Sequence, residues 1–229
     1  MSFQPFLSFG ARRAAAGIGG NDANTKLLLH FDGTDASTTF TDSSSTAHTV
    51  TAVGNAQIDT AQSVFGGASG LFDNAGDYLT IPANAAWNLT GIDCTIDFRV
   101  RFNSLASVDT VIAGGTAGHW FVYAYSDGRI GCGLQGTNEI MAAAGSVTTG
   151  VWYHIAIVRV NSTGRTDIYK DGVSLTNSTT NWTSNASANT IYVGGLGASN
   201  YLDGWIDELR VSHTARWTSG FTPPTGAYD

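Results

Sequence analysis

Apolar and polar residues alternate along several short runs of this 229-residue chain. In CTIDFRVRF, residues 94–102, apolar side chains occupy every second position: Cys94, Ile96, Phe98, Val100 and Phe102. A period of two is typical of a β-strand that buries one face in a core. No segment keeps an apolar period of 3.6 residues over three turns, the pattern of an amphipathic helix. The pattern therefore predicts strands.

Comparable runs recur along the chain, and turn-forming residues separate them. Asp127-Gly128, Ser162-Thr163-Gly164 and Asp171-Gly172 are turn signals of the kind that join neighbouring strands. The runs lie at residues 26–31, 70–81, 94–102, 119–125, 129–134, 152–160, 166–172, 190–195 and 205–211. Many short strands separated by turns predict an all-β sandwich.

Composition narrows the class of protein and its partners. Only 13% of residues are charged and 28 are glycine, which favours a turn-rich β protein over a helical one. The formal net charge of -7, with 11 Lys plus Arg, gives no electrostatic footprint for nucleic acid. No apolar run approaches the roughly 18 residues of a membrane-spanning helix. We therefore expect neither nucleic acid nor membrane as a partner.

The first 25 residues differ from the rest. Phe3, Phe6 and Phe9 precede Arg12 and Arg13, and small residues follow. A secretory signal would place the positive charge before an apolar run, so this segment is not expected to be one. We predict an N-terminal docking arm, residues 1–25, whose phenylalanines anchor it to another protein. A disordered start, or a strand of the domain itself, is the alternative.

An ordered set of sequence phrases resembles a known family. LLLHFDG, FGGASGLFDNAGDYLTIP, TIDFRVRF, WYHIAIVRVNSTGRTDIYKDG and IYVGG followed by YLDGWIDELRVSHTARW resemble a laminin-G-like domain of the concanavalin A-like lectin/glucanase superfamily, over residues 26–217. The resemblance implies a jelly-roll sandwich of two curved antiparallel sheets whose first and last strands pair. Residues 218–229 are expected to form an extended tail that wraps over the domain or leaves it. The tail and FDGTDASTTFTDSS also resemble versions found in bacteriophage virion proteins, on tail fibres or head appendages.

Paired acids near the end of the chain raise the question of catalysis, because some superfamily members are glycoside hydrolases. In a regular strand, Asp207 and Glu208 would point to opposite faces. Asp203 and Asp207 would lie about 13 Å apart between Cα atoms, beyond the carboxyl separations of retaining or inverting glycosidases. Glu139 and Glu208 are the only glutamates, so the closely spaced acids of the glucanases are absent. We expect no enzyme.

The resemblance implies another use for these acids, because many superfamily members hold one structural Ca²⁺ near the first and last strands. Candidate ligands are Asp32, Asp73, Asp77 and Asp207, of which Asp207 matches the family's closing phrase. In the alternative without metal, Asp207 accepts backbone N–H bonds and joins the two ends of the chain. Glu208 would then pair with an arginine, such as Arg210 or Arg159.

Aromatic and amide residues indicate where a sugar would bind, since sugar rings stack on flat aromatic faces. Trp182 is the main candidate platform because it lies in the amide-rich stretch NSTTNWTSNASANT, and Asn200 and Tyr201 are further candidates. Trp120, Trp152 and Trp205 are expected in the core, whereas Trp87 and Trp217 lie near loops.

Single residues of other types carry less information. His154 is expected to be a buried, hydrogen-bonded structural residue. Cys94 and Cys132 are both expected to point inward, either as free thiols or as a disulfide, which their spacing does not decide.

The sequence as a whole predicts a non-enzymatic, lectin-like module of a virus particle. It would bind host-surface glycans, attach to other virion proteins through its N-terminal arm, and form a homo-oligomer. A purely structural capsid or tail decoration protein without sugar binding is the first alternative, and an extracellular bacterial adhesin module is the second.

Overall fold

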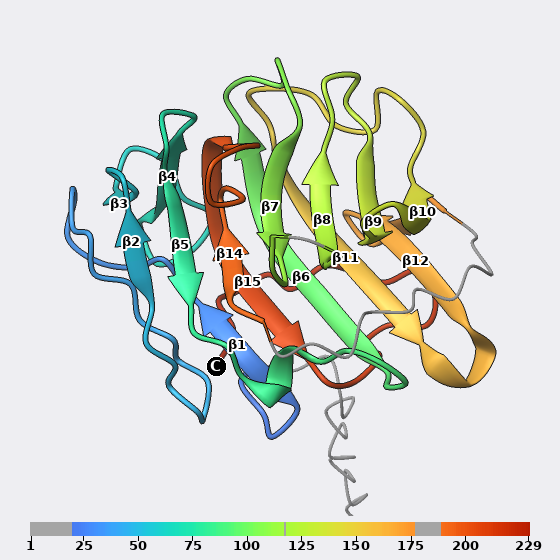
Figure 1. Ribbon diagram of the computed structural model, residues 1–229. Helices are drawn as coiled ribbons and strands as arrows, with labels where there is room; N and C mark the ends of the chain where they lie inside the picture. The colour runs from blue at the N-terminus through green and yellow to red at the C-terminus, as the bar shows by residue number, and fades with distance from the viewer. Residues whose placement is uncertain (1–19, 117, 177–188) are drawn as a thin grey trace, which may run out of the picture.

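The computed structural model describes residues 20–116, 118–176 and 189–229, whose strands form two stacked antiparallel sheets (Figure 1). The eight-stranded sheet, called the back sheet, contains β13 (Val173–Ser174), β12 (Arg165–Lys170), β11 (Trp152–Val160), β6 (Cys94–Phe102), β15 (Asp203–Ser212), β4 (Ser69–Asp73) and β3 (Gln57–Asp59) in this order, and β1 (Thr25–Leu29) pairs with β15. The seven-stranded sheet, called the front sheet, contains β10 (Thr137–Met141), β9 (Ile130–Leu134), β8 (Trp120–Ala124), β7 (Asp109–Ala113), β14 (Ile191–Val193), β5 (Tyr78–Ile81) and β2 (Thr51–Val53).

The predicted all-β sandwich is confirmed, and each predicted run contains at least one strand. Five further strands were not predicted: β2, β3, β7, β10 and β13. Four of these strands are too short or too polar to show alternation, and β7 is fully buried, so its Asp-Thr-Val-Ile-Ala sequence has no period of two. Helical structure in the described residues is limited to the 3-10 turns Ala85–Trp87 and Asn161–Thr163, so no described helix could cross a membrane.

The core lies between the two sheets and is built from alternate residues of facing strands. Ile96, Phe98 and Val100 of β6 belong to the same buried cluster as Trp120 and Val122 of β8. Cys94 and Cys132 also belong to this cluster, and both are free thiols. Burial raises the pKa of Cys94 to about 12, so its thiol stays protonated at neutral pH.

The first and last strands pair, as the resemblance implied. β1 runs antiparallel to β15, with Leu28 opposite Arg210 and Leu29 opposite Leu209. On its other edge β15 pairs with β6, but the register shifts between Asp207 and Arg210. Glu208 lies at this shift with a φ of 51°, in the left-handed region. A β-bulge therefore interrupts the strand at the paired acids.

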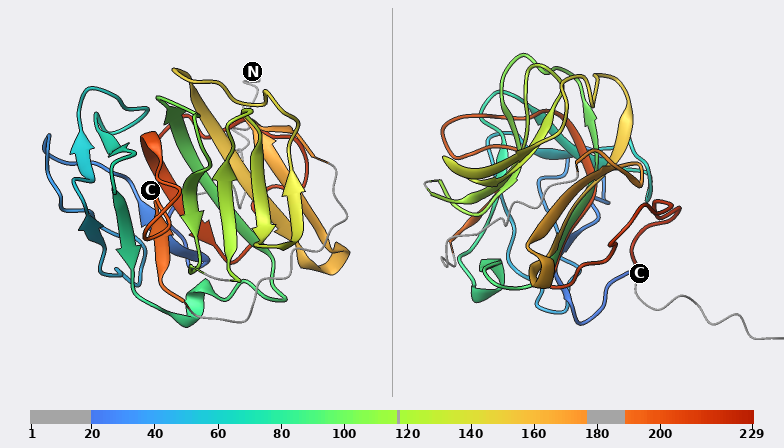
Figure 2. Two further views of the ribbon diagram at one scale, coloured as in Figure 1. Left: turned by 45° about the horizontal axis from the view of Figure 1, so that its top comes forward. Right: turned by 90° about the vertical axis from the view of Figure 1, so that its right-hand side faces the viewer.

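The described C-terminal segment wraps over the outer face of the back sheet (Figure 2). Trp217 stacks on Phe221 with ring centroids 4.1 Å apart. Both rings also contact the imidazole of His154, to which they lie nearly perpendicular. Together with Ala156, Val158 and Tyr169 of the sheet, Trp217 forms a smaller buried cluster apart from the main core. The back sheet is thus packed on both of its faces.

Candidate functional site

Three tyrosines lie together on the front sheet, on the face turned away from the core. Tyr78 of β5 and Tyr192 of β14 have ring centroids 5.9 Å apart, and Tyr201 stacks on Tyr78 at 6.4 Å with an interplanar angle of 18°. Each is half-buried, so part of each ring is open to solvent. Alternation places them there, because their strand neighbours Leu79 and Val193 belong to the core. We call Tyr78, Tyr192 and Tyr201 the tyrosine row.

A pocket of about 340 Å³ opens beside the tyrosine row and shares Tyr192 with it. Its other lining residues are Gly115, Thr116, Asn189 and Thr190. The side chain of Asn189 packs closely against Gly115, where a Cβ atom would come within 2.8 Å of the amide nitrogen. The lining therefore combines an aromatic edge with hydroxyl and amide groups, the combination that recognises sugar hydroxyls.

The loop between β14 and β15 holds Tyr201 against the row. Gly195 has no side chain at the point where a Cβ atom would lie 2.8 Å from the Tyr201 ring. The Tyr201 hydroxyl donates to the carbonyl of Gly197 at 3.0 Å, and the carbonyl of Asn200 accepts from the N–H of Thr110 at 2.9 Å. Of the predicted ligand-binding residues, Tyr201 thus joins the tyrosine row, whereas Asn200 is a left-handed turn residue that anchors the loop to β7.

The positions of the tryptophans differ partly from those that the sequence predicted. Trp182, the main predicted platform, lies outside the described residues. Trp120 is in the core as expected, but Trp152 and Trp205 are half-buried because alternation places them on the outer face of the back sheet. Trp87 is fully buried although it lies in a loop region, and Trp217 is buried beneath the tail.

The paired acids Asp207 and Glu208 lie on the outer face of the back sheet. The expectation that they point to opposite faces is wrong. The bulge adds one residue to β15, so that Asp207 and Glu208 both point away from the core. One carboxylate oxygen of Asp207 accepts from the N–H groups of Val64 and Phe65 at 2.7 and 3.0 Å. Asp207 therefore ties β15 to the loop before β4, rather than joining the two ends of the chain.

Glu208 makes the connection between the chain's ends, and its predicted arginine partner is wrong. Its carboxylate lies 2.7 Å from Nδ1 of His30, just after β1, and accepts the N–H of Tyr228 at 2.9 Å. The hydrogen bond to Glu208 raises the pKa of His30 above its usual value. First strand, last strand and tail thus meet at this one buried carboxylate.

The four predicted calcium ligands fall in two separate places. Asp73 and Asp77 lie in and after β4, where their carboxylate oxygens accept bonds from Asn55, Ala75 and the Asp73 N–H. Asp207 lies at the bulge; burial, with the charges of Glu208 and Asp32, raises its pKa to about 7. One Asp207 oxygen is buried without a hydrogen-bond partner, but in the described residues no three His, Cys, Asp or Glu side chains converge as a metal site. The four predicted ligands therefore do not fit a single calcium ion. Asp207 and Asp32 stay candidate calcium ligands.

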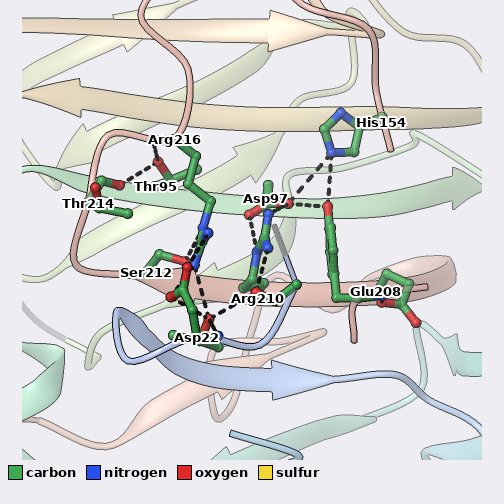
Figure 3. A network of polar contacts seen from close by, with 12 residues as sticks. Asp22, Thr95, Asp97, His154, Glu208, Arg210, Ser212, Thr214 and Arg216 are labelled. Atoms are coloured by element: carbon green, nitrogen blue, oxygen red, sulfur yellow. Dashed lines mark hydrogen bonds and ion pairs between the residues drawn. The ribbon is translucent and has the colours of Figure 1, made fainter. Parts of the chain in front are cut away.

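A buried network of charges lies beneath the tail (Figure 3). Arg210 binds Asp97 through two hydrogen bonds of 3.1 Å, and the Tyr228 hydroxyl donates to the same carboxylate. Burial alone would raise the pKa of Asp97, but the charges and hydrogen bonds of Arg210 and His154 lower it to about 2. His154 is fully buried, as expected. Because the tail and the back sheet enclose these groups, they hold the tail against the sheet.

The sequence contains a signal for the tyrosine row. In DYLTI and TIYVGG the tyrosines alternate with residues of the core, which predicts an outward position for each. That β5 and β14 are neighbours follows only from the sheet order, because more than 100 residues separate them. Gly115 and Thr116 follow β7, which the apolar pattern did not reveal.

Two facing antiparallel sheets, with an aromatic row and a polar pocket on the outer face of one, define a β-sandwich. The chain belongs to the concanavalin A-like lectin/glucanase superfamily, since the family model of that description (Laminin_G_3) matches residues 73–218, more than half of the chain. No curated protein sequence matches the chain significantly.

Solved structures show the same fold. The chain is similar to the botulinum neurotoxin serotype G binding domain (18% identity, TM-score 0.63, 84% of this chain and 48% of that chain). It is also similar to domain 4 of AbnA, an extracellular GH43 arabinanase from Geobacillus stearothermophilus solved with arabinotriose (17%, 0.63, 84% and 93%). A third similar structure is of botulinum neurotoxin type C, a toxin whose cell entry depends on interaction with two ganglioside molecules (17% identity, TM-score 0.60, 84% of this chain and 48% of that chain). The chain spans about half the length of the toxin chains it matches.

Proposed function

We propose that this protein is a non-enzymatic carbohydrate-binding module that uses the outer face of the front sheet. The observation that carries the proposal is the tyrosine row beside a pocket lined by hydroxyl and amide groups. Half-exposed aromatic rings offer a stacking surface for the apolar face of a sugar, and the pocket offers partners for its hydroxyls. Structures of the same fold that are described with arabinotriose and with gangliosides support a carbohydrate partner.

A non-enzymatic role agrees with how the acids are bound. Asp207 accepts two backbone N–H groups and Glu208 is tied to His30 and Tyr228, so both carboxylates are engaged in holding the fold. Neither faces the pocket on the front sheet, because both lie on the back sheet. We propose that they serve structure rather than turnover.

We further propose that the module belongs to a virus particle and presents the front sheet to host-surface glycans. The resemblance of its tail phrase to those of phage virion proteins supports this. The N-terminal arm, with Phe3, Phe6 and Phe9 as anchors, would attach it to capsid or tail proteins as a homo-oligomer. Gly20, the first described residue, lies on the back sheet, where its carbonyl accepts from Arg210 at 3.1 Å. Attachment and glycan binding would thus use opposite sides.

The glycan proposal is tested with one variant and a matched control. Tyr192→Ala removes the ring shared by row and pocket, whereas Tyr153→Ala removes a half-buried strand tyrosine of the back sheet. After a glycan array has identified a ligand, calorimetry should show at least about tenfold weaker binding for Tyr192→Ala, equal to about 1.4 kcal/mol, and unchanged binding for Tyr153→Ala. A wild-type protein that binds no glycan, yet binds virus particles through its arm, would instead be a decoration protein.

Calcium stays a separate proposal, narrowed to Asp207 with Asp32. Titration calorimetry with CaCl₂ should show binding that Asp207→Asn removes and Asp73→Asn leaves intact. If EDTA leaves the melting temperature unchanged and no heat of Ca²⁺ binding is measured, Asp207 acts through its backbone hydrogen bonds alone.

A further inference from the structure

We propose that the ligand of the tyrosine row and its pocket is an electrically neutral carbohydrate, not a glycan that carries sialic acid, uronic acid or sulfate. This inference rests on the proposed function and specifies the chemical class of its ligand. Two observations support it: the pocket is lined by neutral groups, and the positively charged residues of the strands lie on the other sheet.

The pocket offers only neutral groups. Thr116, Thr190 and Tyr192 contribute hydroxyls, Asn189 an amide, and Gly115 only backbone. These groups can donate to and accept from sugar hydroxyls, which both donate and accept. An anionic substituent would have to leave water without gaining a cation, which is costly in a partly enclosed site.

The strands of the front sheet contain no lysine or arginine in their described sequence. The cation that lies nearest in sequence to a strand of the front sheet is Arg129, just before β9, and Asp127 already pairs with it at 2.7 Å. The strands of the back sheet, by contrast, carry Lys26, Arg99, Arg101, Arg159, Arg165, Lys170 and Arg210. Positive charge is therefore placed on the sheet that does not hold the pocket.

The sequence segments that contribute the pocket are themselves uncharged over a long distance. Residues 110–126 and 172–202 contain no Asp, Glu, Lys or Arg. The histidine within them, His119, is buried, and this burial lowers its pKa to about 4, so it is neutral at pH 7. No cation from these segments is thus available to meet an anionic sugar.

The charged residue that directly precedes a tyrosine of the row in sequence is an acid. Asp77 directly precedes Tyr78, and its carboxylate accepts the N–H groups of Asn55 and Asp73. The whole chain carries a net charge of -7. The overall field therefore disfavours the approach of an anion.

Matched glycan pairs test the inference on the full-length protein. For each neutral oligosaccharide bound on an array, calorimetry compares it with the same oligosaccharide bearing one sialic acid or one sulfate. The neutral form should bind at least about tenfold more tightly. Its affinity should change less than about twofold between about 0.02 M and about 0.5 M NaCl, since no charge pair is formed.

A charge-insertion variant shows whether the pocket itself sets this preference. Thr116→Lys places a cation at the exposed rim of the pocket, and Thr218→Lys makes the same change at an exposed position in the segment that follows the back sheet. Thr116→Lys should strengthen binding of the anionic form by about fivefold, equal to about 1 kcal/mol for a solvent-exposed pair, and Thr218→Lys should not.

The outcomes separate this inference from the proposed function. Tighter binding of the anionic form by the wild type, or equal effects of the two lysine variants, would overturn the neutral-ligand inference while leaving carbohydrate binding intact. Binding of neither form would overturn carbohydrate binding itself.

Discussion

Buried acids in this protein behave in opposite ways according to their partners. Asp97 is fully buried, yet Arg210 and His154 lower its pKa to about 2 despite the effect of burial. Asp109 is also buried, and burial together with the negative charge of Asp203 raises its pKa to about 7. The residue type is the same, so the neighbours that the fold supplies decide its charge.

The buried pair of Asp97 and Arg210 should be far more important for stability than an exposed pair. Asp97→Ala would leave the Arg210 guanidinium buried without its carboxylate, at an expected cost of about 3–5 kcal/mol. Asp127→Ala breaks a 2.7 Å pair with Arg129 that is about 40% exposed on both sides, and should cost far less, because solvent screens an exposed pair. Urea denaturation of both variants measures the difference, and equal losses would contradict it.

Asp109 should make stability depend on pH. Because the folded protein holds the Asp109 proton more tightly than the unfolded chain does, its contribution to the free energy of unfolding grows as pH falls from about 7 towards about 4. Asp109→Asn, which cannot ionise, should therefore be more stable than the wild type at pH 8. This advantage should shrink by up to about 1.4 kcal/mol per pH unit as the pH falls through 7.

Thermal melts of both proteins between pH 5 and pH 8 measure this difference. Comparison of the two proteins removes the opposing contribution of His154, whose pKa is lowered by burial and which therefore favours the unfolded state at low pH. Asp127→Asn is the control, because Arg129 lowers the pKa of Asp127 and this side chain stays ionised throughout the range. A constant difference between Asp109→Asn and the wild type would show that Asp109 is ionised in the folded protein at every pH tested.

At the scale of elements, alternation predicted the long strands and failed where a strand departs from regular geometry. β6 follows its expected faces over nine residues. β15 does so only up to Asp207, because the bulge at Glu208 turns both acids outward. A bulge inserts one residue without altering composition, and its position depends on the partner strand, so the sequence pattern gave no sign of it.

The described C-terminal segment is an element without regular secondary structure that should nevertheless stabilise the domain. Phe221 stacks on Trp217 and meets the edges of His154 and Tyr169. Phe221→Ala should lower the free energy of unfolding by about 2 kcal/mol, because it removes aromatic packing over the buried charges. Val173→Ala, at a side chain that is 67% exposed, should have almost no effect. Guanidinium denaturation compares the two, and a neutral Phe221→Ala would mean that the tail does not cover the sheet in solution.

At the scale of the whole molecule, the two sheets carry different tasks. The back sheet is covered by the described C-terminal segment, and the first described residues meet that segment through Asn21 and Asp229 (Figure 2). The front sheet holds the tyrosine row and the pocket on the opposite side. This arrangement suits a module that is attached at one side and binds its ligand at the other.

The proposal predicts that the two tasks can be separated by mutation. Removal of residues 1–19 should leave glycan affinity within about twofold, equal to about 0.4 kcal/mol, and abolish co-sedimentation with virus particles that lack the protein. Replacement of Phe3, Phe6 and Phe9 by alanine should have the same effect, whereas replacement of the polar residues Ser2, Gln4 and Ser8 should not. Loss of glycan binding together with attachment would contradict the separation of the two sides.

The sequence by itself determined the fold class, the long strands and the family, because alternation and turn residues are local properties of the chain. It also contained the outward positions of Tyr78, Tyr192 and Tyr201. Only the tertiary structure decided that these tyrosines meet, since β5 and β14 become neighbours through a sheet order that long-range packing sets. It likewise decided that Glu208 meets His30 and Tyr228, because a bulge and the tail bring together groups that no local pattern connects.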